Sequence, residues 1–143
     1  MTPETEAESN VEQAVPFFMV RSLEDSLRCY VEGIGFTVAK RWINEGKLEW
    51  CWLQLGGAAL MLQQYRPGRV PEGNLGAGVS VCFQCKDALA LYREMRGRGL
   101  QPSRPFVGNG MWVTTLKDPD GYKLDFESPT DLPEETELPE PGE

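Results

Sequence analysis

The chain repeats one order of predicted elements: a strand, a helix and three further strands. Apolar runs and helical or alternating spacing place the first copy at residues 14–21, 22–33, 36–43, 47–55 and 58–64. The second copy follows at residues 79–85, 86–99, 105–107, 111–117 and 122–127. A connection rich in Arg, Pro, Gly and Asn separates the two copies. Such an imperfect repeat predicts two copies of one structural unit.

The first helix carries signals at both of its ends. Ser22 is a good N-cap residue with Asp25 three positions later, and the glycines at 33 and 35 end the helical spacing. Gly99 ends the second helix in the same way. These signals indicate that both helices are short and connect directly to strands.

Residues 118–127 carry the clearest sequence signals for a turn and a strand in the chain. Pro119 presets φ for a turn, the flanking aspartates can accept hydrogen bonds from nearby amides, and Gly121 permits a positive φ. The side chains that follow alternate, with Tyr122, Leu124 and Phe126 on one face and Lys123, Asp125 and Glu127 on the other. This alternation predicts a strand with one buried face, and the polar face is the one available for function.

The formal charge of −8 is concentrated at the two ends of the chain. Residues 1–12 carry four acidic residues and residues 128–143 carry six, with no basic residue in either segment. The part between them has 12 acidic and 14 basic residues, without a run of Lys or Arg. We therefore expect no nucleic-acid partner. Both ends are too polar to fold alone, which predicts disordered acidic tails.

The composition also restricts where the protein works. No apolar run is long enough to span a bilayer, and the N-terminus is acidic where a signal peptide is basic and then apolar. We expect a cytoplasmic protein without a membrane partner. In that compartment the four cysteines should remain thiols and act as small apolar residues.

Three motifs together resemble one family. They are the turn and strand at 118–127, residues 20–27 (Val-Arg-Ser-Leu-Glu-Asp-Ser-Leu) and residues 30–36 (Tyr-Val-Glu-Gly-Ile-Gly-Phe). In this order, and with the repeat, the chain resembles the vicinal oxygen chelate superfamily, which includes glyoxalases, bleomycin-resistance proteins and extradiol dioxygenases. The resemblance implies an α+β fold of two βαβββ modules whose curved mixed sheets form a cleft, with helices on the outer faces.

The expected domain organisation follows from the repeat and the tails. Its parts are a disordered N-terminal tail at 1–13, one domain at 14–129 and a disordered Pro-rich tail at 130–143. Within the domain we expect module one at 14–64, a linker at 65–78 and module two at 79–129.

The resemblance also gives the positions at which relatives that use a metal place its ligands. They correspond to Val15, Met61, Ser80 and Asp125, of which only Asp125 is a hard-metal ligand. The chain contains no histidine, so it lacks the commonest transition-metal ligand and the commonest acid or base at neutral pH. We expect no metal and no cofactor, with Asp125 left as a carboxylate without partners.

Two other chemical arrangements are weaker. Cys82 and Cys85 lie three apart on a predicted strand and point to opposite faces, so structural thiols are favoured over a zinc site. Asp125 and Glu127 share one face and could act as an acid and base pair if one had a raised pKa. The favoured alternative is a charge-paired strand edge that includes Lys123, because nothing in the sequence indicates desolvation.

The predicted cleft is rich in apolar and aromatic side chains. Strand parity places Phe17 and Met19 after Val15, and Gln63 after Met61, on the cleft face. The strands also carry Trp42, Trp50, Trp52, Phe106, Trp112 and Tyr122, whose faces the pattern does not assign. Our predicted ligand-binding residues are Phe17, Met19, Trp50, Trp52, Met61, Gln63, Ser80, Trp112 and Asp125. Tryptophans beside amides and carboxylates suit a flat or amphipathic organic ligand, including a cationic one.

The leading functional hypothesis is a metal-free binding protein that is similar to the bleomycin-resistance branch and sequesters a small organic molecule. In that branch a second subunit completes the cleft, so the resemblance implies a homodimer. The alternative is a lyase or isomerase of the glyoxalase superfamily that uses Asp125 and Glu127, with no metal or a poorly coordinated one. A third hypothesis is a domain that only mediates association, with its own side chains filling the cleft.

Overall fold

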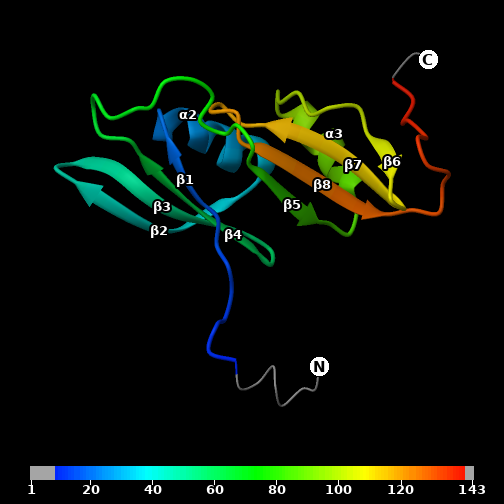
Figure 1. Ribbon diagram of the computed structural model, residues 1–143, viewed down its shortest axis with the longest axis horizontal. Coiled ribbons are helices and arrows are strands. Elements are labelled where there is room, and N and C mark those ends of the chain that lie inside the picture. The colour runs from blue at the N-terminus through cyan, green and yellow to red at the C-terminus, as the bar shows by residue number, and fades with distance from the viewer. Residues whose placement is uncertain (1–8, 141–143) are drawn as a thin grey trace.

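The computed structural model describes residues 9–140 and consists of two four-stranded mixed sheets with few helices (Figure 1). Sheet A has the strand order β1-β4-β3-β2, and sheet B has the order β5-β8-β7-β6. Sheet A is formed by β1 (Phe17–Val20), β2 (Thr37–Asn44), β3 (Lys47–Leu55) and β4 (Ala58–Gln64). Sheet B is formed by β5 (Ser80–Gln84), β6 (Phe106–Gly108), β7 (Met111–Lys117) and β8 (Lys123–Pro129). The predicted α+β fold of two βαβββ modules is confirmed, since each sheet pairs its first strand in parallel with its fourth.

The helical segments are α2 (Leu23–Leu27), the π-helix η1 (Arg28–Ile34) and α3 (Ala88–Gly97). The predicted N-cap is present, because the Ser22 side chain accepts a hydrogen bond from the Asp25 N–H at 3.2 Å. Gly35 ends η1 in the left-handed conformation, with φ of 113°. The structure differs from the single helix expected at 22–33, because its second part widens into a π-helix.

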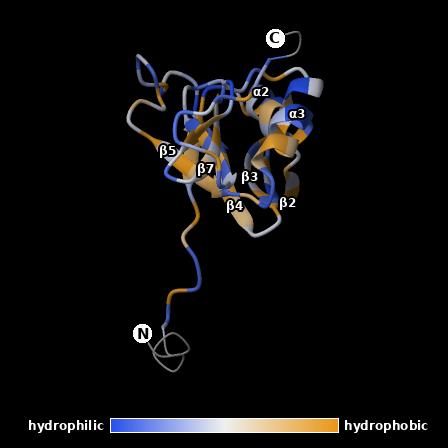
Figure 2. Ribbon diagram, turned by 90° about the vertical axis from the view of Figure 1, so that its right-hand side faces the viewer, coloured by the Kyte–Doolittle hydropathy of each residue, from blue (hydrophilic) through white to orange (hydrophobic). Residues whose placement is uncertain are grey.

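Both sheets lie on one side of the molecule and the helical segments lie on the other (Figures 1 and 2). A single core fills the space between these layers. Its fully buried side chains come from both modules, and they include Val20, Leu60 and Leu62 of sheet A and Leu124 and Phe126 of sheet B. Each sheet therefore has a core face, packed against the helices, and an open face on the opposite side.

The turn at 118–121 connects the two modules. Tyr30 of η1 is fully buried and donates a hydrogen bond to the Asp118 carboxylate at 2.7 Å. Asp118 in turn accepts hydrogen bonds from the backbone N–H groups of Asp120 and Tyr122 at 2.8 and 2.9 Å. The Tyr122 ring stacks on Phe18 of β1 with 4.0 Å between ring centroids. The turn that looks purely local in the sequence thus fixes module two against module one.

The C-terminal segment differs from its prediction. We expected disorder from residue 130, but residues 130–140 run along β6 and hydrogen-bond to its backbone. The Val107 N–H donates to Thr136 O at 2.8 Å, and the Glu135 N–H donates to Val107 O at 2.9 Å. The Arg104 side chain also donates to Leu138 O at 2.6 Å. The edge strand β6 supplies the backbone partners that the composition of this segment does not reveal.

The N-terminal segment was also predicted to be disordered. Residues 1–8 lie outside the described residues, residues 9–16 have no regular structure, and the first of them extend away from the sheets (Figure 1). No helix within residues 9–140 has the length and apolar composition needed to cross a membrane.

Candidate functional site

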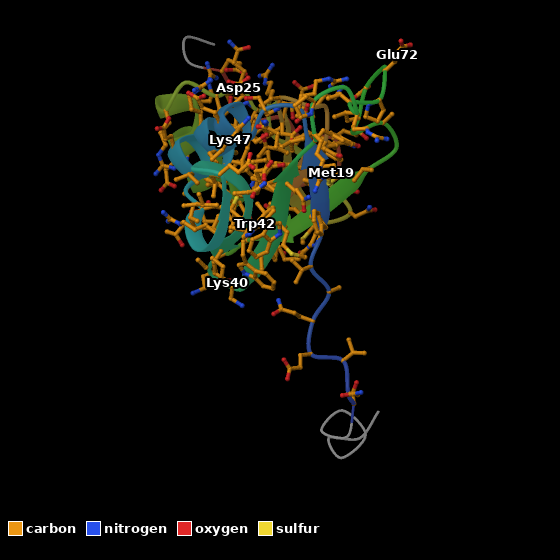
Figure 3. All side chains as sticks on the ribbon, turned by 90° about the vertical axis from the view of Figure 1, so that its left-hand side faces the viewer. Met19, Asp25, Lys40, Trp42, Lys47 and Glu72 are labelled. Carbon is orange, nitrogen blue, oxygen red and sulfur yellow. The ribbon has the colours of Figure 1, made fainter. Side chains whose placement is uncertain are left out.

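The open face of sheet A carries two rows of aromatic and apolar side chains. Strand pairing places Phe17 beside Met61, Met61 beside Trp52, and Trp52 beside Lys40. The second row, one step along the strands, is Met19, Gln63, Trp50 and Trp42. Figure 3 views the molecule from the end at which sheet A lies and labels Met19, Lys40 and Trp42. Strand register therefore brings six predicted site residues together: Phe17, Met19, Trp50, Trp52, Met61 and Gln63.

These side chains are accessible, although most are aromatic or apolar. Phe17 is 47% exposed and Trp42 is 48% exposed, whereas Trp50 and Trp52 are half-buried among their neighbours. The Lys40 ammonium lies 5.0 Å from the centre of the Trp52 ring, and the Trp52 indole N–H donates to the Gln54 side chain at 3.0 Å. Sheet A thus presents an accessible aromatic surface with a cation on its edge strand β2. Trp42 was missing from our predicted site, and its pairing with Trp50 is the signal that places it there.

The open face of sheet B is polar and charged. Asp125 accepts hydrogen bonds from Ser80 Oγ at 2.9 Å and from Thr115 Oγ1 at 2.5 Å. Its neighbour Glu127 accepts one from the Gln84 side-chain amide at 2.6 Å. Residues from three adjacent strands therefore hold the two carboxylates in fixed positions.

The expectation that Asp125 has no partners is wrong. Besides the two hydroxyl groups, Lys123 Nζ lies 3.9 Å from Asp125 Oδ2. On β5, Cys82 is the residue paired with Asp125, and Ser80 lies two residues before it on the same face, while Thr115 lies directly opposite Asp125 in the antiparallel β7–β8 pair. This register is not readable from β8 alone, which explains why the sequence did not reveal these donors.

Glu127 also affects the neighbouring thiol of Cys82. Desolvation and the interaction with Glu127 raise the pKa of the Cys82 thiol from 9.0 to about 11. A thiol with this pKa is almost entirely protonated at neutral pH, and hence a weak nucleophile and a poor metal ligand. The chemistry of the open face of sheet B is therefore that of its two carboxylates and its hydrogen-bond donors.

The residues at the family's metal-ligand positions do not fit a metal ion. Ser80 and Asp125 adjoin, but the Ser80 hydroxyl already donates to the carboxylate. Met61 belongs to the other sheet and offers only a thioether, while Val15 precedes β1 and has no donor atom. Within the described part of the chain, no three His, Cys, Asp or Glu side chains gather closely enough to hold a metal.

Trp112 is the one predicted site residue that lies on a core face. It pairs with Ser128, whose hydroxyl is buried and accepts a hydrogen bond from the first residue of α3. Thr114 and Leu116 share its face of β7 and are buried, whereas Thr115 reaches Asp125 on the opposite face. The structure therefore does not bring Trp112 together with the other tryptophans.

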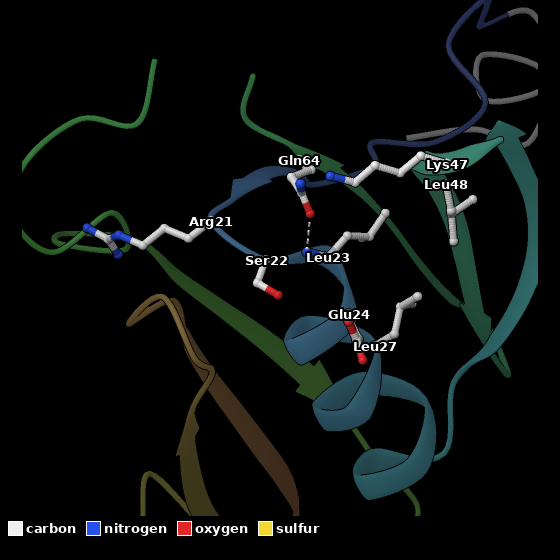
Figure 4. A pocket seen from close by; sticks show the side chains of 8 residues that line it. All are labelled: Arg21, Ser22, Leu23, Glu24, Leu27, Lys47, Leu48 and Gln64. Atoms are coloured by element: carbon white, nitrogen blue, oxygen red, sulfur yellow. Dashed lines mark hydrogen bonds between the residues drawn. The ribbon is translucent and has the colours of Figure 1, made fainter. Parts of the chain in front are cut away.

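Two of the pockets lie away from the aromatic rows. One, of about 460 Å³, opens on the core side of sheet A between the start of α2 and the tip of the β2–β3 hairpin (Figure 4). Within it the Leu23 N–H donates to Gln64 Oε1 at 2.8 Å. Another, of about 830 Å³, lies between the β3–β4 turn and the end of β5, and includes Cys82 and Gln84 at its edge. The aromatic rows line neither pocket.

Comparisons with known proteins agree with this architecture. The family model described as Glyoxalase/Bleomycin resistance protein/Dioxygenase superfamily matches residues 12–126. A bleomycin resistance determinant encoded on the transposon Tn5 has a similar structure, with 26% identity and a TM-score of 0.66, over 85% of this chain and 100% of that one. The comparison with curated proteins gave no match.

Two further solved structures are less similar in sequence and show the shared fold alone. TnmS3, an antibiotic binding protein from Streptomyces sp. CB03234, is 21% identical with a TM-score of 0.64, over 85% of this chain and 100% of that one. A glyoxalase/bleomycin resistance protein/dioxygenase from Nocardioides is 17% identical with a TM-score of 0.63, over 95% of this chain and 96% of that one. On the family match, the two repeated modules and the strand order of both sheets, the chain belongs to the glyoxalase, bleomycin resistance protein and dioxygenase superfamily.

Proposed function

We propose that the protein is a metal-free binding protein of the bleomycin-resistance type, which sequesters a small organic molecule against the open faces of its sheets. The observation that carries the proposal is the double row of side chains on sheet A, with Trp42, Trp50 and Trp52 on one surface. Flat aromatic walls combined with a few polar groups are typical of sites for amphipathic organic ligands. The similarity to the Tn5 bleomycin resistance determinant supports the same class of function.

Sheet B supplies the polar part of the site in this proposal. Asp125 and Glu127 point to the open face and are held by neutral donors from neighbouring strands. Fixed carboxylates of this kind can accept hydrogen bonds from, or pair with, a cationic or polar group of the ligand. Sheet A would then contact the flat part of the ligand, and sheet B would orient it.

The protein functions as a homodimer in this proposal. The two open faces of one chain lie on the same side of the molecule rather than opposite each other (Figures 1 and 2). On the open face of sheet A, Phe17 and Trp42 are each about half exposed, with 47% and 48% of their surface accessible. A second copy that covers these faces would bury apolar side chains and enclose the ligand between two walls.

Tryptophan fluorescence offers a direct test, because three of the four tryptophans lie on the open face and the fourth lies on a core face. The experiment titrates wild-type protein, Trp50→Phe, Trp52→Phe and Trp112→Phe with a panel of aromatic antibiotics that includes bleomycin. We expect quenching by at least one compound, with affinity reduced about tenfold in Trp50→Phe and Trp52→Phe and unchanged in Trp112→Phe. Equal losses in all three variants would contradict the site.

Two further results would overturn the proposal itself. Stoichiometric Mn, Fe, Ni or Zn in protein purified without added metal or an affinity tag would contradict a metal-free site. Turnover of a thiol adduct or diketone that Asp125→Asn abolishes, without loss of binding, would establish the enzyme alternative. Native mass spectrometry of freshly purified protein reports metal, bound ligand and subunit number in one measurement.

A further inference from the structure

A pocket of about 330 Å³ adjoins the open face of sheet B at the end of the face nearest Ser80. Two lysines, Lys117 and Lys123, line it together with the loop that precedes β5. The residues lining the pocket are Asn74, Gly76, Ala77, Gly78, Val79, Ser80, Lys117, Gly121 and Lys123. This lining contains two cations and no acidic residue, although the chain as a whole is acidic.

The two lysines lie directly opposite each other. Lys117 at the end of β7 pairs with Lys123 at the start of β8, and both belong to the face that carries Asp125. Like charges in directly opposed positions of a sheet destabilise the pairing of its strands. Lys123 has a weak counter-ion in Asp125 at 3.9 Å. Within residues 9–140, no carboxylate lies within salt-bridge distance of Lys117.

The wall of the pocket is a fixed loop with little side-chain bulk. The Gly76 N–H donates to Asp120 O at 3.0 Å, and the Lys123 N–H donates to Val79 O at 3.2 Å. A Cβ placed on Gly76 would lie 2.1 Å from the Tyr122 nitrogen, so the loop packs directly on the β7–β8 turn. The Asn74 side chain accepts a hydrogen bond from the Gly76 N–H through its oxygen, which leaves its NH₂ group available as a donor.

We propose that this pocket binds the anionic oxygens of a carboxylate, phosphate or sulfate group on the sequestered ligand. The Lys117 and Lys123 ammonium groups and the Asn74 amide would hold these oxygens, and the bound anion would relieve the repulsion between the lysines. Ser80 connects the pocket to the rest of the face, because it lines the pocket and hydrogen-bonds Asp125. Asp125 lies about 7 Å further along β8 and Glu127 about 13 Å, given the rise per residue of a strand.

This inference rests on the proposed function and specifies its ligand as an aromatic molecule with an anionic group. A cationic group about 7–13 Å from that anion would reach the carboxylates and make the ligand a zwitterion. This spacing follows from the sequence of β8, because Lys123, Asp125 and Glu127 follow one another on the open face of sheet B.

The test uses three probes on the full-length protein at constant ionic strength: indole-3-propionate, its neutral analogue indole-3-propionamide, and inorganic phosphate. Amide chemical shifts of Ala77, Gly78 and Ser80 report on the pocket, and the indole N–H chemical shifts of Trp50 and Trp52 report on sheet A. We expect the carboxylate to bind about tenfold more tightly than the amide, and the double variant with Lys117→Gln and Lys123→Gln to bind both equally. The control variant, Lys47→Gln with Lys86→Gln, removes the same charge elsewhere and should retain the preference.

The outcomes distinguish a failure of the anion pocket from a failure of the proposed ligand-binding function. Equal binding of carboxylate and amide to wild-type protein, or a preference that survives loss of both lysines, overturns the pocket while leaving an aromatic site intact. Quenching that fails with every aromatic compound counts against the proposed function instead. Displacement of indole-3-propionate by phosphate would show that the pocket accepts either anion, whereas binding of the carboxylate without such competition would restrict it to carboxylates.

Discussion

Replacing Tyr30 with phenylalanine tests whether the buried hydrogen bond to Asp118 holds the two modules together. The Tyr30 side chain is fully buried, its hydroxyl lies 2.7 Å from Asp118 Oδ2, and Asp118 is 5% exposed. The substitution removes one oxygen atom and leaves the ring packed against Phe36. Any loss of stability therefore reports on the hydrogen bond more than on the core.

The expected loss follows from the charge of the acceptor. Asp118 Oδ1 retains two backbone donors in the variant, but Oδ2 loses the tyrosine hydroxyl and stays buried. Hydrogen bonds to charged groups contribute about 1.5–3 kcal/mol, compared with about 0.5–1.5 kcal/mol between neutral groups. We expect Tyr30→Phe to lower the free energy of unfolding at pH 7 by about 1.5–3 kcal/mol.

The loss should depend on pH in a direction fixed by Asp118. Burial, supported by the nearby Asp120 carboxylate, raises the pKa of Asp118 above its ordinary value of 3.8, and the Tyr30 hydrogen bond partly offsets that rise. The folded protein therefore binds the Asp118 proton more tightly than the unfolded chain does. This contribution to stability is fully present below pH 3.8 and is lost as pH rises through the raised pKa. Without the Tyr30 hydroxyl the pKa is higher still. The variant therefore loses more stability at pH 7 than near pH 4.

Urea unfolding of both proteins at pH 4, 5, 6 and 7 measures this difference. Tyr122→Phe is the matched control, because its hydroxyl donates at 2.9 Å to a neutral acceptor, the Met19 carbonyl. We expect the control to lose about 0.5–1.5 kcal/mol at every pH. A Tyr30→Phe loss that is the same at pH 4 and pH 7, or is no larger than that of Tyr122→Phe, would refute the reasoning.

Three other substitutions and one deletion have clear expected outcomes. Gly76→Ala should cost about 1–3 kcal/mol or more in urea unfolding, because its Cβ would overlap a backbone nitrogen. Gly57→Ala, which has open space, should cost less than about 0.5 kcal/mol. Deleting 130–143 should speed hydrogen exchange at the β6 amides about tenfold, whereas a disordered tail would leave exchange unchanged. Cys82 should be alkylated about tenfold more slowly at pH 7.5 than a thiol of pKa 9, because its smaller thiolate fraction outweighs the higher nucleophilicity of that thiolate, and Glu127→Gln should speed the reaction.

The fold could be predicted because its signals are local and repeated. Gly35, Gly99 and Gly121 all adopt the positive φ that ends a helix or closes a turn, with values of 113°, 92° and 85°. The π-helical form of η1 could not be predicted in this way. Its residues contact partners that are distant in the sequence, including Asp118 and the side chain of Arg98, which donates to Gly33 O at 3.3 Å. Helical spacing alone does not register such contacts.

The sequence predicted the faces of candidate site residues correctly only on strands where alternating residues show which side chains face the core and which face outward. On β1, Phe17 and Met19 alternate with the buried residues Phe18 and Val20, and this alternation gave the open face of the strand. The same reasoning gives no face for Trp112, because β7 has apolar side chains at both parities and only pairing with β8 distinguishes them. The C-terminal segment shows the same limit, since its composition indicates disorder while its order comes from the edge of β6.

The two modules share a core pattern but differ in the chemistry of their open faces, and this difference is informative about assembly. Sheet A presents tryptophans and methionines, whereas sheet B presents carboxylates, amides and lysines. Pairing sheet B with its own copy would bring Asp125 and Glu127 toward like charges, and pairing two copies of sheet A would leave the polar faces in water without a ligand. Pairing sheet A of one copy with sheet B of the other avoids both problems. It would also give each of the two resulting sites an aromatic wall, a carboxylate wall and the lysine pocket at one end.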